Sequence, residues 1–149
     1  MKNFEFSLET VLRYKESIYK EKKSNYARSL EDVNRKKQEI YDFNKELLKT
    51  MSDFDIIKKK CSNVATYRIY VNTIDDKTKI IEKSKEQLGV LENVLRGKKR
   101  EMIESKCDVS KFEKLREHKY KEYLEDIKKA SEIFIDEFVS HNSRHSELA

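Results

Sequence analysis

Few side chains in this sequence have the types and the spacing that metal binding or catalysis requires. His141 and His145 stand one helical turn apart, a spacing that can hold a metal ion, but no third ligand lies near them in a tail rich in Ser and Asn. Cys61 and Cys107 belong to no C-x-x-C pair, which predicts reduced thiols rather than a zinc site or a disulfide framework. We therefore expect no metal site and no cofactor.

Carboxylates are plentiful, but none stands in a catalytic pattern. The sequence contains no nucleophile elbow, no phosphate loop and no dinucleotide-binding fingerprint. Acidic residues alternate with Lys and Arg along the whole chain, and ion pairs between residues one helical turn apart explain this composition. We therefore expect no catalytic site and a protein that is not an enzyme.

The composition favours long helices over every other architecture. The 149 residues include 2 Gly and no Pro, so the tight turns of multi-stranded sheets lack the residues that they need. Hydrophobic residues make up 37%, too few for a thick globular core, whereas 10% aromatic residues argue against disorder. The net charge of +5 is spread among interleaved acids, so we expect no specific nucleic-acid partner. The longest charge-free stretch, 61–67, is too short to span a membrane, and we expect a soluble cytosolic protein with no direct membrane insertion.

An apolar residue recurs at every seventh position in two long series. The first series is Leu12, Tyr19, Tyr26, Val33, Ile40, Leu47, Phe54 and Cys61. The second series is Tyr67, Ile74, Ile81, Leu88, Leu95, Met102 and Val109. Because a helix turns once in 3.6 residues, a stripe with a repeat of seven stays on one face only where the helix supercoils around a partner. The pattern therefore predicts a coiled coil.

The two series fit each other if the chain folds back near Val64, next to the N-cap candidates Ser62 and Asn63. This folding pairs Phe54 with Ile74 and continues the pairing along both stripes. The predicted fold class is all-α: a long two-helix antiparallel coiled-coil hairpin whose second helix is longer and overhangs the first. We expect one coiled-coil rod over 1–149. Its predicted parts are helix 1 at about 7–60, a bend at about 61–64, helix 2 at about 64–139 and a frayed tail at 140–149.

The apolar stripe changes face in the second half of the predicted second helix. The step from Val109 to Tyr120 is one heptad plus a four-residue stutter, and 110–113 has the form of a capping box. A kink or a third helix at 108–113 is one interpretation; we favour a continuous helix because no Gly or Pro lies nearby. Beyond the stutter, the apolar residues of 134–139 have no partner helix and need another protein or a second copy of the chain.

Apolar residues also crowd the start of the second helix, beyond what a single seam can bury. They form either a hydrophobic cap on the hairpin or a docking patch. Tyr70, Ile74 and Lys77 share one helical face, and Phe43 of the first helix lies within reach of it.

The residues Phe4–Tyr14, which follow the pattern F-x-F-x-L-x-x-V-L, resemble the opening of the flagellar export protein family FliJ. Chain length, the scarcity of Gly and Pro, and the unit Tyr70–Ile74 are similar to that family. The resemblance implies a non-enzymatic coiled-coil component of the flagellar type III export apparatus, cytoplasmic and peripheral at the cytoplasmic face of the inner membrane.

The partners that the resemblance implies are the hexameric export ATPase, the transmembrane export gate protein and export chaperones. It also implies a gate-binding patch at Tyr70, Ile74 and Lys77 with Phe43 opposite, although the family has a small apolar residue where Lys77 stands. A self-associating structural tether, in which the overhang pairs with a second copy, is the alternative function.

Overall fold

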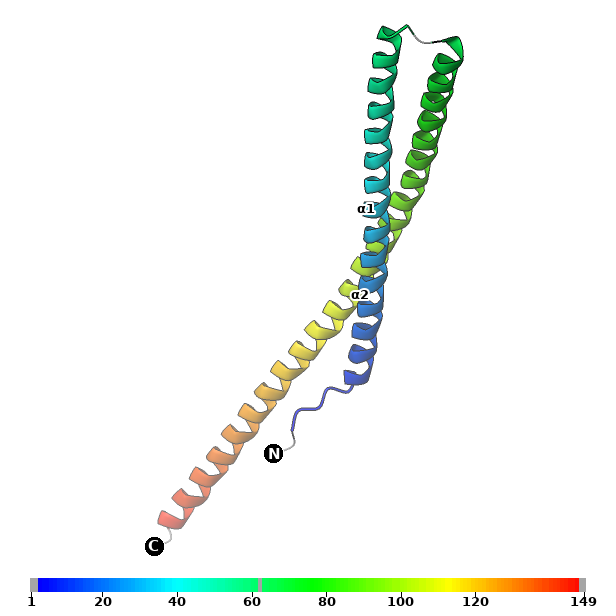
Figure 1. Cartoon of the computed structure of the whole chain (residues 1–149). Helices are drawn as coiled ribbons and strands as arrows, with labels where there is room; N and C mark the ends of the chain where they lie inside the picture. The colour runs from blue at the N-terminus through cyan, green and yellow to red at the C-terminus, as the bar shows by residue number, and fades with distance from the viewer. Residues whose placement is uncertain (1–2, 62, 148–149) are drawn as a thin grey trace. The chain divides into compact units, whose positions relative to one another are not determined.

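The computed structural model describes residues 3–61 and 63–147, and nearly all of them lie in two helices. Helix α1 spans Glu9–Lys59 and helix α2 spans Val64–Glu147, and the described residues contain no strand (Figure 1). The two long helices pack against each other as a hairpin, which confirms the predicted all-α fold class.

The helix ends at the bend follow local backbone chemistry. Helix α1 ends on Lys58 and Lys59, whose charges favour the negative end of the helix dipole. Cys61 then takes a left-handed conformation with φ of 52°, which turns the chain out of the helix. Asn63 caps α2: its side-chain Oδ1 accepts hydrogen bonds from the backbone N–H groups of Ala65 at 2.5 Å and Thr66 at 3.3 Å. The other N-cap candidate, Ser62, lies outside the described residues.

Helix α2 is longer than the sequence pattern predicted. It begins at Val64 as expected but continues to Glu147, so a frayed tail from residue 140 is not what the structure shows; residues 148–149 lie outside the described part of the chain. The sequence after Val139 contains no Gly or Pro that would end the helix. It has few apolar residues, but this does not interrupt the backbone hydrogen bonds of α2. Helix α2 is also one continuous helix through 108–113, because a stutter moves the apolar face without breaking backbone hydrogen bonds.

The chain was expected to form one rod, and its contacts divide it into two compact units. The tip unit is Lys20–Ile103, which includes the bend. The terminal unit combines Met1–Tyr19 with Glu104–Ala149. Both helices contribute to both units.

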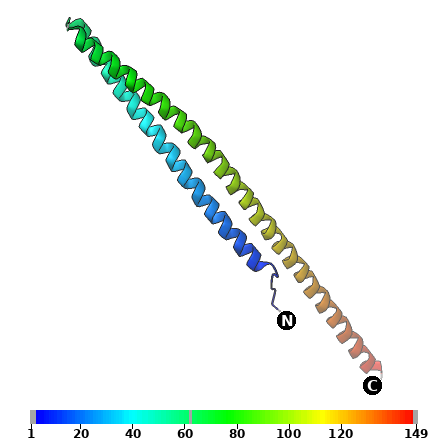
Figure 2. The same cartoon turned by 90° about the vertical axis from the view of Figure 1, so that its right-hand side faces the viewer.

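In the tip unit the predicted stripes face each other, and α1 and α2 lie side by side (Figure 2). Val33, Ile40 and Ile81 are buried between the helices. Ion pairs flank this seam, including Lys22–Glu101 at 3.0 Å and Lys77–Glu46 at 3.4 Å. The partner's number in α2 falls from 101 to 77 as the residue number in α1 rises from 22 to 46, so together the pairs fit only the antiparallel arrangement.

The register of this seam differs from the predicted pairing by one helical turn. Phe54 stacks on Tyr70, with ring centroids 5.5 Å apart and planes at 12°, and does not pair with Ile74. Steps of seven residues from this contact bring Ile40 level with the buried Ser84. Each stripe residue of α1 therefore lies opposite the companion heptad position of α2, which is how a and d positions meet in antiparallel coiled coils.

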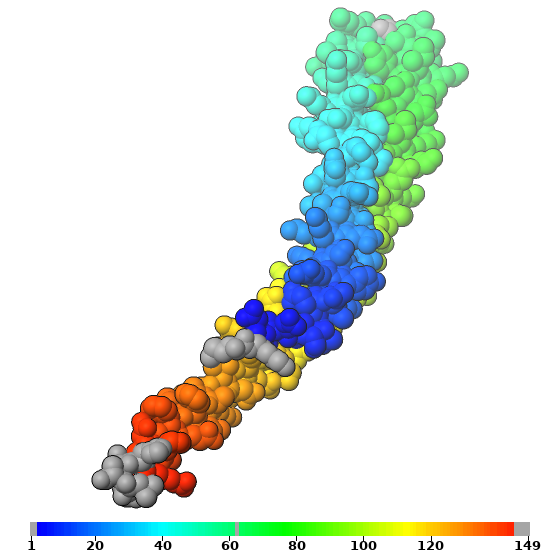
Figure 3. All heavy atoms as spheres, turned by 90° about the horizontal axis from the view of Figure 1, so that it is seen from below, coloured from blue at the N-terminus to red at the C-terminus, as the bar shows by residue number. Residues whose placement is uncertain are grey.

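In the terminal unit, the segment before α1 supplies part of the core. Phe6, Leu12 and Val109 form a buried cluster, and the hydrophobic residues packed against it are Phe4, Leu8, Tyr19 and Phe112. Figure 3 shows this N-terminal segment, in dark blue, lying against the yellow part of α2. The F-x-F-x-L pattern thus belongs to a segment that turns into α1 at Ser7 and Leu8, and its apolar side chains are more buried than the residues between them.

Candidate partner-binding surfaces

The four residues predicted as a partner-binding patch all lie in the tip unit, at the seam. Phe43, Tyr70, Ile74 and Lys77 are each half-buried. Tyr70 stacks on Phe54, and the Lys77 ammonium lies 3.4 Å from the Glu46 carboxylate across the helices. Tyr70 and Lys77 therefore take part in the contact between the two helices, and part of each of the four side chains stays open to solvent. Whether their exposed edges bind a partner stays a prediction.

Aromatic packing stabilises the end of the tip unit. Phe54 contacts Tyr67 edge-on, with centroids 6.0 Å apart, as well as stacking on Tyr70. The Lys58 ammonium lies 4.2 Å from the centroid of the Phe54 ring, a cation–π contact. The exposed large hydrophobic side chains at this end are aliphatic. They are Ile56, Val64, Ile69 and Val71.

The opening segment has a structural role in the terminal unit that the sequence pattern did not reveal. The Phe4 ring lies 5.2 Å from Tyr120 and 5.5 Å from Tyr123, centroid to centroid. It thereby covers Tyr120 and Tyr123, where the apolar stripe of α2 resumes after the stutter. The signal for this contact was the alternation of Phe4, Phe6 and Leu8 before the first helical turn.

A shallow groove of about 880 Å³ runs between this segment and α2 in the terminal unit. Aromatic and charged residues line it. Its lining residues are Phe4, Glu5, Phe6, Glu9, Glu113, Arg116, Glu117 and Tyr120. Glu9 pairs with Arg116 at 3.6 Å, and the Lys121 ammonium, 2.7 Å from Glu117, holds the pKa of that carboxyl below its ordinary value. These pairs are exposed and involve two of the four carboxylates that line the groove.

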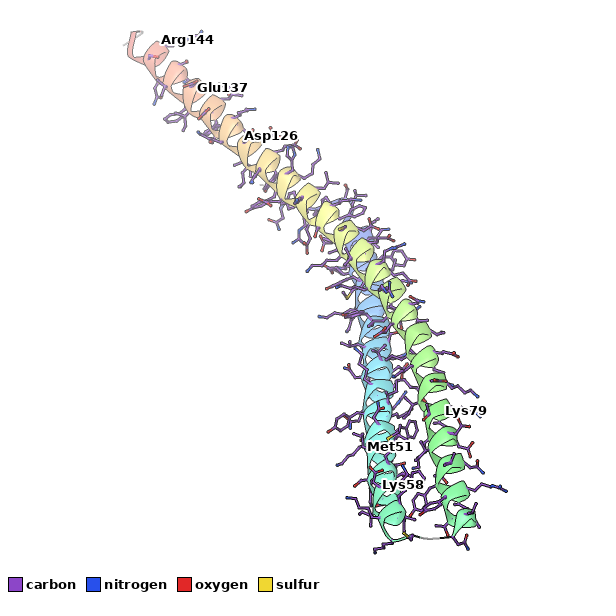
Figure 4. All side chains as sticks on the ribbon, turned by 90° about the horizontal axis from the view of Figure 1, so that it is seen from above. Met51, Lys58, Lys79, Asp126, Glu137 and Arg144 are labelled. Carbon is purple, nitrogen blue, oxygen red and sulfur yellow. The ribbon has the colours of Figure 1, made fainter. Side chains whose placement is uncertain are left out.

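The C-terminal part of the terminal unit carries an apolar stripe that the described residues leave uncovered. Phe134 is 69% exposed and Phe138 is 60% exposed, and the neighbouring Ile135 and Val139 are exposed as well. No second helix accompanies α2 around Glu137 and Arg144 (Figure 4). The apolar residues of 134–139, for which the sequence pattern predicts no partner helix within the chain, are exposed. We call Leu124, Ile127, Phe134 and Phe138 the C-terminal stripe.

The histidine and cysteine positions form no metal site in the part of the chain that the structure describes. No group of three His, Cys, Asp or Glu side chains there is close enough to hold a metal ion. The side chain of His145 lies outside the described residues. Cys61 and Cys107 are both exposed free thiols, one in each unit.

Comparison with known proteins identifies the family. A family model described as FliJ, flagellar FliJ protein, matches residues 4–148. The chain belongs to the FliJ family. The match covers the extended opening, both helices and the C-terminal stripe, so it extends the sequence resemblance from the opening motif to essentially the whole chain. No curated protein and no solved structure matches the chain.

Membership in the FliJ family makes the protein a component of the flagellar export apparatus. Among the residues that the structure describes, no helix is long and apolar enough to cross a bilayer.

Proposed function

We propose that the protein is a non-enzymatic coiled-coil subunit that associates with the hexameric export ATPase and with the transmembrane export gate, and that it also receives export chaperones. The observation that carries this proposal is the family match over residues 4–148. The proposed site of action is the cytoplasmic face of the inner membrane.

The C-terminal stripe supports a contact with the ATPase. Its large apolar side chains are exposed on a helix that extends past the N-terminal segment, and exposed apolar stripes of this kind mark interaction surfaces. Removing Phe134 and Phe138 from water against a partner stabilises the complex by about 1.5–3 kcal/mol each. We propose that this stripe binds the ATPase ring.

The predicted patch at the tip unit serves the gate contact in this proposal. Tyr70, Ile74, Lys77 and Phe43 are each half-buried, so part of each side chain is available to a partner. Since the same residues stabilise the hairpin, a variant in this patch is interpretable only beside a stability measurement.

The test mixes the purified protein with the export ATPase and measures hydrolysis and ring assembly. The protein is expected to stimulate hydrolysis at substoichiometric ratios, and the double substitution Phe134→Ser with Phe138→Ser is expected to abolish that stimulation. Ile133→Ser is the matched control, because Ile133 is equally exposed but projects from another side of α2. No effect of the unchanged protein on the ATPase would remove the proposal.

The gate contact is tested separately, by binding of the purified gate protein. Tyr70→Ala with Ile74→Ala is expected to weaken gate binding while leaving ATPase stimulation intact. Ile57→Ala, which also removes half-buried seam volume at the tip, controls for loss of stability. Equal losses in the two variants would show that the patch is only structural.

A self-associating tether is the second candidate function, and the exposed C-terminal stripe favours it. In this alternative the stripe of one chain pairs with that of another. The mass in solution separates the two functions: a monomer near 17.9 kDa supports the export function, and a stable dimer that Phe138→Ser dissociates supports the tether.

A further inference from the structure

The sequence around the bend has a charge pattern that is unlike the rest of the chain. No Asp or Glu occurs from Ile56 to Ile74, whereas acidic residues alternate with basic residues elsewhere. The same run contains Lys58, Lys59, Lys60 and Arg68, all of them exposed. Helix α2 also has no acidic residue in its first turn. The run around the bend is therefore positively charged, and the nearest acidic residue, Asp55, lies just outside it and pairs with Lys58.

Exposed aliphatic side chains lie among these charges. Val64 is 72% exposed and Ile69 is 66% exposed, and Ile56 and Val71 are also open to solvent. The aromatic residues of this region lie in the seam, so the aliphatic residues are not needed to hold the hairpin together. Basic residues that surround exposed aliphatic ones are typical of segments that lie at a lipid interface.

The directions of these side chains favour a lipid surface over a protein partner. Ile69 and Val71 are two residues apart on α2 and therefore project about 200° apart around the helix. Ile56 projects from α1 and Val64 from the first turn of α2. A folded protein partner covers one face, whereas a fluid interface accepts side chains on every side of an inserted end. Val64 to Val71 spans about 10 Å, which is the depth of interfacial insertion.

We propose that the end of the tip unit binds an anionic lipid surface. Val64, Ile69 and their aliphatic neighbours enter the boundary between headgroups and acyl chains, and the lysines and Arg68 contact the lipid phosphates. This shallow contact departs from the expectation of no direct membrane insertion. Lys58, labelled in Figure 4, lies on the last turn of α1 and is positioned there by Phe54 and by Asp55 at 3.5 Å. This contact needs only the chain and the lipid, so it stands independently of the proposed ATPase and gate partners.

The first experiment is sedimentation of the purified full-length chain with vesicles. Binding is expected to vesicles of phosphatidylcholine mixed with phosphatidylglycerol, to weaken with added salt, and to be absent with phosphatidylcholine alone. Lys59→Glu with Lys60→Glu is expected to lower the partition coefficient at least about tenfold, since each base near an anionic surface contributes about fivefold. Lys99→Glu with Arg100→Glu, an adjacent exposed pair with the same change in net charge, is expected to bind like the unchanged protein.

The second experiment uses the two native thiols as matched reporters. A polarity-sensitive fluorophore on Cys61, with Cys107→Ser, is expected to shift to the blue when anionic vesicles are added, because Cys61 is exposed at the bend. The same fluorophore on Cys107, with Cys61→Ser, is expected to show no shift.

Ile69→Ser is expected to lower the partition coefficient about tenfold through loss of apolar burial.

Three outcomes would overturn the proposal. The first is an absence of binding to anionic vesicles, which would favour an acidic protein surface as the partner of the positive end. The second is an equal loss of binding in the Lys59/Lys60 and Lys99/Arg100 variants, which would mean nonspecific attraction of a basic protein. The third is a blue shift at Cys107 without one at Cys61, which would place the lipid contact on the other unit.

Discussion

Apolar residues of the same type differ widely in how much they stabilise the hairpin, because the seam is narrow and buries only some of them. Leu12 is 1% exposed in the core of the terminal unit, whereas Leu48 is 67% exposed on the outer side of α1. We expect Leu12→Ala to lower the free energy of unfolding by about 2–5 kcal/mol, since it removes buried methyl groups and leaves a cavity. Leu48→Ala, the same chemical change on the surface, is expected to alter it by less than about 0.5 kcal/mol. Urea unfolding followed by circular dichroism measures both, and similar losses would contradict the observed burial.

A second prediction at this scale concerns pH. The Lys22 ammonium donates a hydrogen bond of 3.0 Å to Glu101, which lowers the pKa of that carboxyl below its ordinary value of 4.5. A carboxyl that binds its proton less readily in the folded chain contributes stability above about pH 4.5, and this stability is lost as the pH falls through the lower folded pKa. The same bond raises the pKa of Lys22, whose contribution is lost only at strongly alkaline pH.

The substitution Glu101→Gln is expected to narrow the difference in urea midpoint between about pH 7 and about pH 3, because the titrating group is gone. Glu104→Gln, a change of an exposed carboxyl on the same helix, serves as the control. An unchanged difference in Glu101→Gln would mean that solvent screens this exposed pair completely.

At the scale of the elements, α2 contains two glycines in its interior without a structural need for them. A Cβ added at Gly89 or at Gly97 meets no atom within 4 Å, and neither residue has a positive φ. Since glycine weakens a helix by about 0.5–1 kcal/mol relative to alanine, we expect Gly89→Ala and Gly97→Ala to stabilise the protein by about that amount each. The thermal midpoint measured by circular dichroism should rise by roughly 2–4 °C per substitution. A fall in the thermal midpoint would contradict this, because it would mean that the added methyl group disturbs a neighbouring contact.

Much of this fold could be predicted from the spacing of apolar residues. The stripe through Val33 and Ile40 is buried as predicted, and α2 begins at Val64. The register could not be fixed, because a repeat of seven does not show whether a stripe residue of α1 meets a stripe residue or a companion position of α2. The contact of Phe54 with Tyr70 decides it, and this contact depends on how a and d positions interleave in space.

Two contacts at the candidate surfaces could not be predicted from the sequence, and the reason is geometric. The heptad pattern placed Ile74 in the seam, but it did not show that Tyr70 and Lys77 also contact α1. The contact of Phe4 with Tyr120 joins the segment before α1 to a part of α2 that is far away in the sequence, so no periodic pattern predicts it. By contrast, the exposure of Phe134 and Phe138 followed directly from counting helical partners.

At the scale of the whole molecule, the pairing of α1 with α2 within one chain underlies both the proposed function and the proposed lipid contact. A monomeric hairpin leaves its C-terminal stripe and its tip free for different partners. If the helices paired between chains instead, the bend would be lost and the acid-free run around it would form a continuous helix.

Spin labels on cysteines at positions 22 and 101, with Cys61 and Cys107 replaced by serine, test this pairing most directly. The structure joins Lys22 and Glu101 across the seam at 3.0 Å, so the label–label distance from pulsed electron resonance should be short, below roughly 25 Å, and should persist in an excess of unlabelled protein. A parallel arrangement would separate the positions by roughly 36 Å along the helices. That longer distance, or a short one that disappears on dilution with unlabelled chains, would contradict the antiparallel hairpin.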